Sequence, residues 1–187
     1  VASSSASDAD YDKAINSGPV AAADVVAASP WAASVKQAKK LVTGGTKTSE
    51  VFSWEDSKTK KISGFDAAIA QALARYIIGG DDARSLLEVQ QVTSETRETV
   101  LTNGTVKAVI ATYTITPERA KKIDFAGPYY ASSQAILVKA DNKDITGVDT
   151  LTGDVAVQSN SSSAAALKKY APKATAKPFD TQAKCVA

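Results

Sequence analysis

The stretch "LEVQQVTSETRETVLTNGTVKAVIA" (residues 87–111) decides the fold. It begins with an apolar run typical of a strand over 87–92 and continues with a helical segment over 94–104 that an Asn-Gly pair can end. A second apolar run over 107–111 is typical of another strand. A strand, a helix and a strand of these lengths predict a βαβ unit with parallel strands, so we expect an α/β fold.

The same alternation continues toward the N-terminus. The run over 40–45 is typical of a strand that ends in glycines, and the segment over 66–78 has apolar side chains at helical spacing before a Gly-Gly stop. The positions that share this helical face are Ile69, Leu73, Tyr76 and Ile77. A Ser-Pro pair suits the start of a short docking helix over 29–40. The basic segment over 57–64 is typical of a solvated hairpin tip, and the whole predicts a parallel sheet with helices on both faces.

A second unit of the same kind follows nearer the C-terminus. After an apolar strand expected over 134–140, the pattern predicts a strand over 154–158, a helix over 161–171, a strand over 174–179 and the start of another helix. Two strands are too few for a stable lobe on their own. We therefore expect this lobe to be incomplete in this chain.

The composition excludes several classes of protein. Basic residues number 22 and acidic residues 20, so the chain lacks the one-sided basic field of a nucleic-acid-binding protein. Histidine is absent, which excludes a Ser/His/Asp triad, a Cys/His pair and a zinc site of His and Cys ligands within this chain. The lone cysteine, Cys185, cannot form an internal disulfide and is typical of an apolar helix-face residue. With 44% hydrophobic residues among 187, the chain can bury a core.

The N-terminal region shows no clear period. Residues 1–28 are rich in Ala, Ser and Asp, which indicates a tether followed by loosely organised turns. The first ten residues are polar and hold no signal-peptide core, and no stretch approaches the ~20 apolar residues of a membrane-spanning helix. We expect a soluble chain that has already been processed.

Three threonines on alternate positions follow the last strand of the first half. Thr112, Thr114 and Thr116 lie where the carboxyl ends of open α/β sheets bind ligands. Alternate side chains of an extended segment share a face, so Thr112 and Thr114 can both point into a cleft. A structural alternative is that Thr116 caps a short helix, with the next proline in its first position and Arg119 on the surface. Both interpretations can hold at once.

These segments carry a family resemblance. The blocks "GFDAAIAQALA", "RETVLTNGTVKAVIATYTITPERAKKIDFAGPYY", "ILVKADN" and "VAVQSNSSSAAALKKYAP" follow one another in the order and spacing of the family 3 extracellular solute-binding proteins of amino-acid ABC transporters. The resemblance spans roughly residues 40–187. The stretch "GGTKTSEVFSWED" is most similar to the glutamate/glutamine-binding lipoproteins of actinobacteria.

The resemblance implies a two-lobed, type II periplasmic-binding-protein architecture, also called a Venus flytrap. It divides the chain into an N-terminal tether (1–28), lobe 1 (29–136), a hinge crossing (137–145) and a partial lobe 2 (146–187). In such proteins the chain later returns through a second crossing strand. This chain is expected to be C-terminally incomplete, and it ends before the lobe 2 aspartate that usually receives the ligand ammonium group.

The implied function is the capture of a free polar or acidic amino acid between the two lobes, for delivery to the permease subunits of an ABC importer. Glutamate, glutamine, aspartate and asparagine are the ligands considered. We expect a monomer on the extracellular face of the cytoplasmic membrane, which it meets only through an N-terminal lipid anchor. No cofactor, metal or catalytic residue is expected. The alternatives are a ligand-sensing ectodomain and, less favoured, a dehydratase or lyase on the same fold.

The resemblance assigns the ligand's α-carboxylate to Arg119, with Thr114 and Thr112 beside it. A planar guanidinium gives a carboxylate two parallel charge-assisted hydrogen bonds, which a lysine cannot imitate. In the second lobe, Ser161 and Ser162 stand at the start of a helix, where backbone N–H groups and the positive dipole end attract an anion. N-capping alone is the alternative explanation of these serines.

Other candidates surround the ligand's side chain. Lys47 stands on the loop after the first strand, where related glutamate binders also carry lysine, and it would favour a second carboxylate; an exposed loop charge is the alternative. Phe52 and Trp54 are candidate walls against the ligand's methylenes, or core residues. Asp66 is expected to cap its helix and brace the first loop rather than to contact the ligand.

The chain departs from its relatives at two positions. Asn160 stands where relatives usually have glycine, and asparagine tolerates left-handed backbone angles better than other non-glycine residues. The turn can therefore survive, although a close approach to a ligand is less favoured. Lys107 stands where relatives normally have aspartate, away from the cleft end of its strand, and nothing in the sequence explains the exchange.

Overall fold

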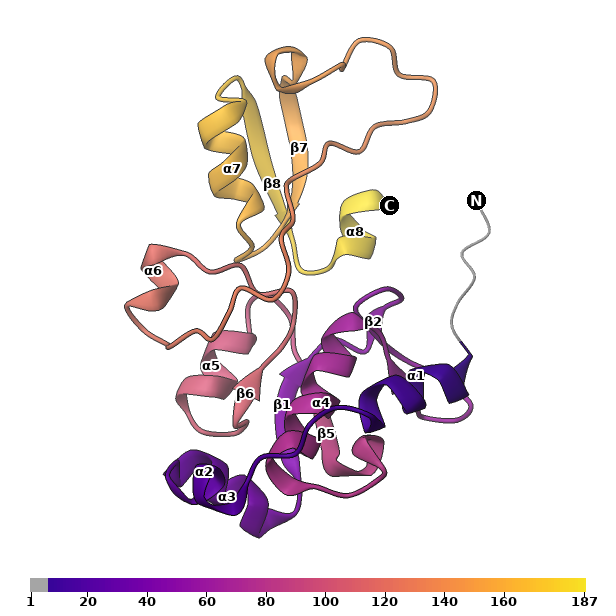
Figure 1. Cartoon of the computed structure of the whole chain (residues 1–187). Coiled ribbons are helices and arrows are strands. Elements are labelled where there is room, and N and C mark those ends of the chain that lie inside the picture. The colour runs from indigo at the N-terminus through magenta and orange to yellow at the C-terminus, as the bar shows by residue number, and fades with distance from the viewer. Residues whose placement is uncertain (1–6) are drawn as a thin grey trace. The chain divides into compact units, whose positions relative to one another are not determined.

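The computed structural model describes residues 7–187 (Figure 1). The chain divides into two compact units. The first unit comprises the chain up to Val92 together with Thr99–Tyr113, and the second comprises Thr93–Glu98 together with Thr114–Ala187. The lobes expected from the sequence have other boundaries and stay a prediction.

The first unit is built on a parallel sheet. Its strands are β1 (Leu41–Gly45), β5 (Leu87–Gln91) and β6 (Ala108–Val109), in the order β5-β1-β6. β1 pairs with both neighbours in parallel, and Thr43 lies opposite both Val89 and Ala108. The predicted βαβ arrangement is confirmed, with α5 (Arg97–Thr102) as the connecting helix.

Helices α3 (Pro30–Ala38) and α4 (Phe65–Ile78) supply much of the core, and the predicted helices at these places are confirmed. The predicted face of α4 is only partly right, because Tyr76 is exposed whereas Ala74 and Ile77 are buried. Alanines make up half of the buried residues of α4, whereas the larger Ile69 and Leu73 are only partly buried. The core cluster consists of Val26, Ala32, Val35, Leu41, Ala74 and Ile77.

A small antiparallel sheet follows β1. It contains β2 (Thr48–Ser49), β3 (Ser53–Glu55) and β4 (Ile62–Ser63), in that order. The basic turn predicted at a hairpin tip joins β3 to β4, where the Asp56 carboxylate accepts hydrogen bonds from the backbone N–H groups of Lys58 (2.9 Å) and Thr59 (2.7 Å). The prediction of a hairpin tip is therefore confirmed.

Gly64 joins this sheet to α4 at a point of close backbone approach. Its φ angle of +125° lies in a region that residues with a Cβ rarely adopt. A Cβ at this position would lie 2.5 Å from the backbone carbonyl group of Phe52. The Phe52 oxygen is fixed there because it accepts hydrogen bonds from the first amides of α4, those of Asp66 (2.8 Å) and Ala67 (3.2 Å).

The expectation of loosely organised turns before residue 29 is wrong for the described residues. The chain forms α1 (Asp8–Asn16), which Ser7 caps, and α2 (Ala23–Ala27). Ile15 and Val26 are buried and tie these helices to the first unit. Residues 1–6 of the predicted tether lie outside the described part.

Arg84, in the 3₁₀ helix η1 (Ala83–Leu86), holds α1 in place. Its guanidinium lies 4.5 Å from the centre of the Tyr11 ring, and its Nε donates to the Asp12 carboxylate. The Tyr11 hydroxyl lies 3.0 Å from Oε1 of Gln71 and 3.2 Å from the Gly64 carbonyl oxygen. Partners more than 50 residues away in the sequence therefore order α1, which explains why its local composition did not reveal the docking.

The second unit contains a parallel strand pair that α7 connects. Its elements are α6 (Pro117–Ala120), η2 (Val148–Thr150), β7 (Gly153–Gln158), α7 (Ser163–Tyr170), β8 (Ala174–Phe179) and α8 (Gln182–Val186). β7 and β8 pair in parallel from Gly153 opposite Ala174 to Gln158 opposite Phe179, which confirms the predicted βαβ pattern. Cys185 lies half-buried on α8.

The strand expected over 134–140 is wrong. This segment is irregular in the structure, and Leu137 is 77% exposed. A strand is stable only when its backbone hydrogen-bonds to a neighbour, and the strands described in residues 7–187 do not pair with this segment. Within the same residues, no helix has the length and apolar character that a membrane span needs.

We predict that Gly64→Ala lowers the free energy of unfolding of the first unit by about 3 kcal/mol or more, because it combines an unfavourable φ with a backbone clash. Urea unfolding followed by the fluorescence of Trp31 and Trp54 measures this change. Gly80→Ala is the matched control, because Gly80 also has a positive φ (+96°) but faces open space. Equal effects of the two substitutions would show that the close approach to Phe52 is unimportant.

A second prediction concerns the pH dependence of unfolding. Burial raises the pKa of Tyr11 to about 12. The phenol therefore stays protonated in the folded chain while it ionises in the unfolded chain, so the stability that it contributes is complete below about pH 10 and declines toward pH 12. Tyr11→Phe removes this contribution, and the variant should lose less stability than the unsubstituted chain between pH 10 and 12. Tyr170→Phe, which removes an exposed tyrosine, should keep the original dependence.

Candidate functional site

Arg119 is held by backbone groups of the second unit. Thr116 caps α6 by accepting a hydrogen bond from the Arg119 N–H (3.3 Å), as the structural alternative predicted. The half-buried guanidinium turns back from the helix: Nη1 donates to the Thr114 carbonyl oxygen (2.8 Å) and Nη2 to the Asn160 carbonyl oxygen (2.9 Å). The predicted Thr116 cap is therefore confirmed, and the ligand role of Arg119 stays a prediction.

Asn160 supports this arrangement through its backbone. Its φ angle is +54°, in the left-handed region that asparagine tolerates. The left-handed turn expected at this position is thus present, and it presents the Asn160 carbonyl oxygen to Arg119.

The serines that follow divide into two roles. The Ser161 hydroxyl donates to the Gln158 carbonyl oxygen (2.7 Å) and accepts from the Ser163 N–H (3.2 Å), so this side chain stabilises the turn into α7. The Ser162 hydroxyl makes no such cap and lies 3.5 Å from the Thr114 hydroxyl. The second unit therefore brings Thr114, Arg119 and Ser162 together, whereas Ser161 serves the local turn.

Thr112, Lys47 and Phe52 belong to the first unit. Thr112 has a φ of +48°, and its N–H donates to the Asp66 carboxylate (2.7 Å). Asp66 is buried at the second position of α4, and the N-cap of this helix is Gly64. The prediction that Asp66 caps the helix is therefore wrong. Its carboxylate instead braces the turn at Thr112. Phe52 is half-buried and its carbonyl oxygen receives the first amides of α4.

The side chain of Lys47 forms an ion pair within the first unit. Its side-chain ammonium lies 2.9 Å from the Glu55 carboxylate on β3. Its backbone N–H donates to Oε1 of Gln91 (2.8 Å). The hydrogen bond and the charge of Lys47 lower the pKa of Glu55, which keeps this carboxylate ionised. Lys60 Nζ lies 4.0 Å from the other oxygen of the same carboxylate, so two lysines share Glu55.

Sequence reasoning missed two residues. Gln134 contacts the serines at the start of α7, and the only signal in the sequence is a polar residue at the head of the apolar run "QAILVKA". Arg97 is 5% exposed at the start of α5, and its burial follows from tertiary packing that no local pattern reveals.

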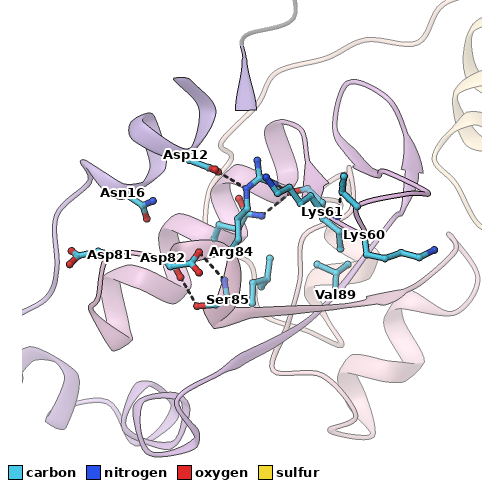
Figure 2. A pocket seen from close by; sticks show the side chains of 13 residues that line it. Asp12, Asn16, Lys60, Lys61, Asp81, Asp82, Arg84, Ser85 and Val89 are labelled. Atoms are coloured by element: carbon cyan, nitrogen blue, oxygen red, sulfur yellow. Dashed lines mark hydrogen bonds and ion pairs between the residues drawn. The ribbon is translucent and has the colours of Figure 1, made fainter. Parts of the chain in front are cut away.

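A hollow of about 610 Å³ lies elsewhere in the first unit (Figure 2). It is bounded by α1, the β3–β4 turn, η1 and β5, and Figure 2 shows Arg84 beside it with Asp12 on one side and Lys61 on the other. Both carboxylates and cations line its wall, and none of the residues predicted to bind a ligand lines it. Among residues 7–187 no cluster of side chains could hold a metal ion.

The family model of the bacterial extracellular solute-binding proteins, family 3, matches residues 41–182. The chain belongs to this family. The predicted family membership is therefore confirmed. The relatives of this family 3 chain are binding proteins rather than enzymes, as expected.

Two curated relatives illustrate the match. The glutamine-binding protein of Geobacillus stearothermophilus is 36% identical over 150 residues, which cover 80% of this chain and 56% of the relative. The glutamate-binding protein GluB of Corynebacterium efficiens is 31% identical over 150 residues, or 78% of this chain and 50% of the relative. The chain thus spans about half the length of these relatives.

Solved structures show the same fold. The ancestral amino acid-binding protein AncCDT-1, a precursor of cyclohexadienyl dehydratase, matches with a TM-score of 0.73 and 32% identity over 83% of this chain and 68% of its own. An ancestral arginine-binding protein bound to glutamine matches with a TM-score of 0.66 and 32% identity over 79% of this chain and 63% of its own. The family 3 chain therefore has the α/β fold of type II periplasmic amino-acid-binding proteins, over part of their length.

Proposed function

We propose that this family 3 protein is the amino-acid-binding component of an ABC importer, which captures a free polar or acidic amino acid outside the cell and delivers it to a membrane permease. The observation that carries the proposal is the arrangement of Arg119, Thr114 and Ser162 in the second unit. The names of the relatives support glutamine or glutamate as the ligand, and one ancestral arginine-binding protein has been solved with glutamine bound.

The chemistry of this group suits a carboxylate. The Arg119 guanidinium donates to two neutral carbonyl oxygens, which hold its plane. A ligand carboxylate is a stronger acceptor than a carbonyl, because both members of the bond are then charged. The Thr114 and Ser162 hydroxyls lie 3.5 Å apart, and each can add a donor to the same anion. We propose that they bind the α-carboxylate of the amino acid.

For the first unit, we propose that Thr112, Lys47 and Phe52 contact the remainder of the ligand. The Lys47–Glu55 pair bears on which ligand is preferred. Because Glu55 lies 2.9 Å from Lys47 but 4.0 Å from Lys60, it offsets the charge of Lys47 most strongly and weakens the attraction of Lys47 for a second carboxylate. This favours a neutral amide such as glutamine over glutamate.

Calorimetry on the full chain, after removal of bound ligand by unfolding and refolding, tests the proposal directly. We expect saturable heat with at least one of glutamine, glutamate, asparagine and aspartate. Arg119→Lys should weaken that binding by about 10- to 100-fold, because a lysine keeps the charge but loses the forked pair of bonds. Lys121→Ala removes an exposed cation from the same helix and should leave the affinity unchanged.

Arg119→Lys also removes two internal hydrogen bonds, so its thermal unfolding has to be measured alongside. Normal affinity in a stable Arg119→Lys variant would remove this residue from the binding site. Absence of heat with all four amino acids would contradict the proposed function.

A separate prediction concerns selectivity. Glu55→Gln leaves Lys47 without its anionic partner, so the ratio of glutamate affinity to glutamine affinity should rise about threefold or more. Competition calorimetry measures the ratio, and Glu50→Gln, at an exposed position of the same loop, is the matched control. Equal ratios in the two variants would place Lys47 outside the ligand's reach.

A further inference from the structure

The side-chain amide of Gln134 connects two serines at the start of α7. Its Nε2 donates to the Ser162 hydroxyl oxygen (3.2 Å), and its Oε1 accepts from the Ser163 hydroxyl (2.9 Å). Gln134 thereby makes one bond as a donor and one as an acceptor, because a side-chain amide has a separate donor atom and acceptor atom. All three residues belong to the second unit.

The donor bond from Gln134 determines what Ser162 can offer. A hydroxyl that accepts from an N–H directs its own hydrogen away from that donor. The Thr114 hydroxyl, 3.5 Å from Ser162, lies within reach of this hydrogen. With Gln134 in place, Ser162 is therefore oriented as a donor within the group that also contains Arg119.

The acceptor bond fixes Gln134 itself. The segment around Gln134 is irregular, and the side chain is exposed, so its rotamer would otherwise be mobile. The hydrogen bond from Ser163, the first residue of α7, ties this segment to the helix. One helix end thus orients the amide, and the amide orients the neighbouring hydroxyl.

We propose that Gln134 is a positioning residue of the carboxylate site, which acts by holding the Ser162 hydroxyl as a hydrogen-bond donor toward the ligand's α-carboxylate. This inference rests on the proposed function. It assigns Gln134 no ligand contact of its own.

The test combines affinity with an observation that does not need a ligand. L-glutamine is the probe, titrated into the full chain by calorimetry. Gln134→Ala should weaken binding by about 3- to 10-fold, the range expected for one hydrogen bond. Gln134→Glu should weaken it further, because a carboxylate only accepts: both serine hydroxyls would donate to it, and its charge would oppose the ligand's. Gln37→Ala and Gln37→Glu, at an exposed position of α3, are the matched controls and should bind as the unsubstituted chain does.

A double-mutant cycle separates positioning from a general structural role. If Gln134 acts through Ser162, Gln134→Ala should have little further effect in a Ser162→Ala background. In parallel, NMR relaxation of the side-chain amide should show Gln134 to be more ordered than Gln37, and Ser162→Ala should reduce that order.

The outcomes distinguish the two proposals. Full additivity in the cycle, or an amide of Gln134 as mobile as that of Gln37 while the unsubstituted chain binds glutamine, would overturn the positioning role alone. Failure of the unsubstituted chain to bind glutamine or any of the other three amino acids would overturn the proposed function and this inference with it. A coupled loss of affinity with an ordered amide would support both.

Discussion

The first unit depends on the hydrogen bonding of β1 along both of its edges. The Lys107 N–H donates to the Val42 carbonyl oxygen (2.8 Å), the Ile110 N–H to that of Gly44 (2.9 Å), and on the other side the Val92 N–H to that of Gly45 (3.0 Å). Because the three strands run parallel, the segments that follow them leave the sheet at the same edge. The loop with Lys47 and the turn at Thr112 therefore both begin there.

Much of this first unit could be predicted because its signals are local. Apolar runs of strand length, a helical segment between them and an Asn-Gly stop specify a βαβ unit without knowledge of its surroundings. The parallel pairing of the strands follows from these signals, whereas the order β5-β1-β6 is known only from the structure. The prediction failed where structure depends on distant partners. α1 is ordered by Arg84 and Gln71, and nothing in the Ala- and Ser-rich composition of its own segment indicates these contacts. The strand predicted over 134–140 is absent for a different reason. The composition of this segment suits a strand, but within the described residues no other strand pairs with it.

The candidate site shows the same division. The threonines, the arginine and the serines could be chosen from the sequence because their residue types suit a carboxylate and their order resembles a known family. The hydrogen-bond and ion-pair partners of these residues could not be predicted from the sequence. That the carbonyl oxygens of Thr114 and Asn160 direct the Arg119 guanidinium is a property of backbone conformation, including the left-handed angle of Asn160. The pairing of Lys47 with Glu55 depends on the register of β2 and β3, and this pairing alters the expected charge of the site.

The docking of the N-terminal helices affects where the chain can be shortened. The family match begins at residue 41, yet Val26, Ala32 and Val35 pack in one cluster with Leu41, Ala74 and Ile77. A version trimmed to the family boundary would uncover apolar surface on α4 and β1 and would remove the ring that covers Arg84. Such a truncated protein should aggregate or lose its fold, so expression trials guided by homology alone would discard residues that the domain needs in order to stay folded.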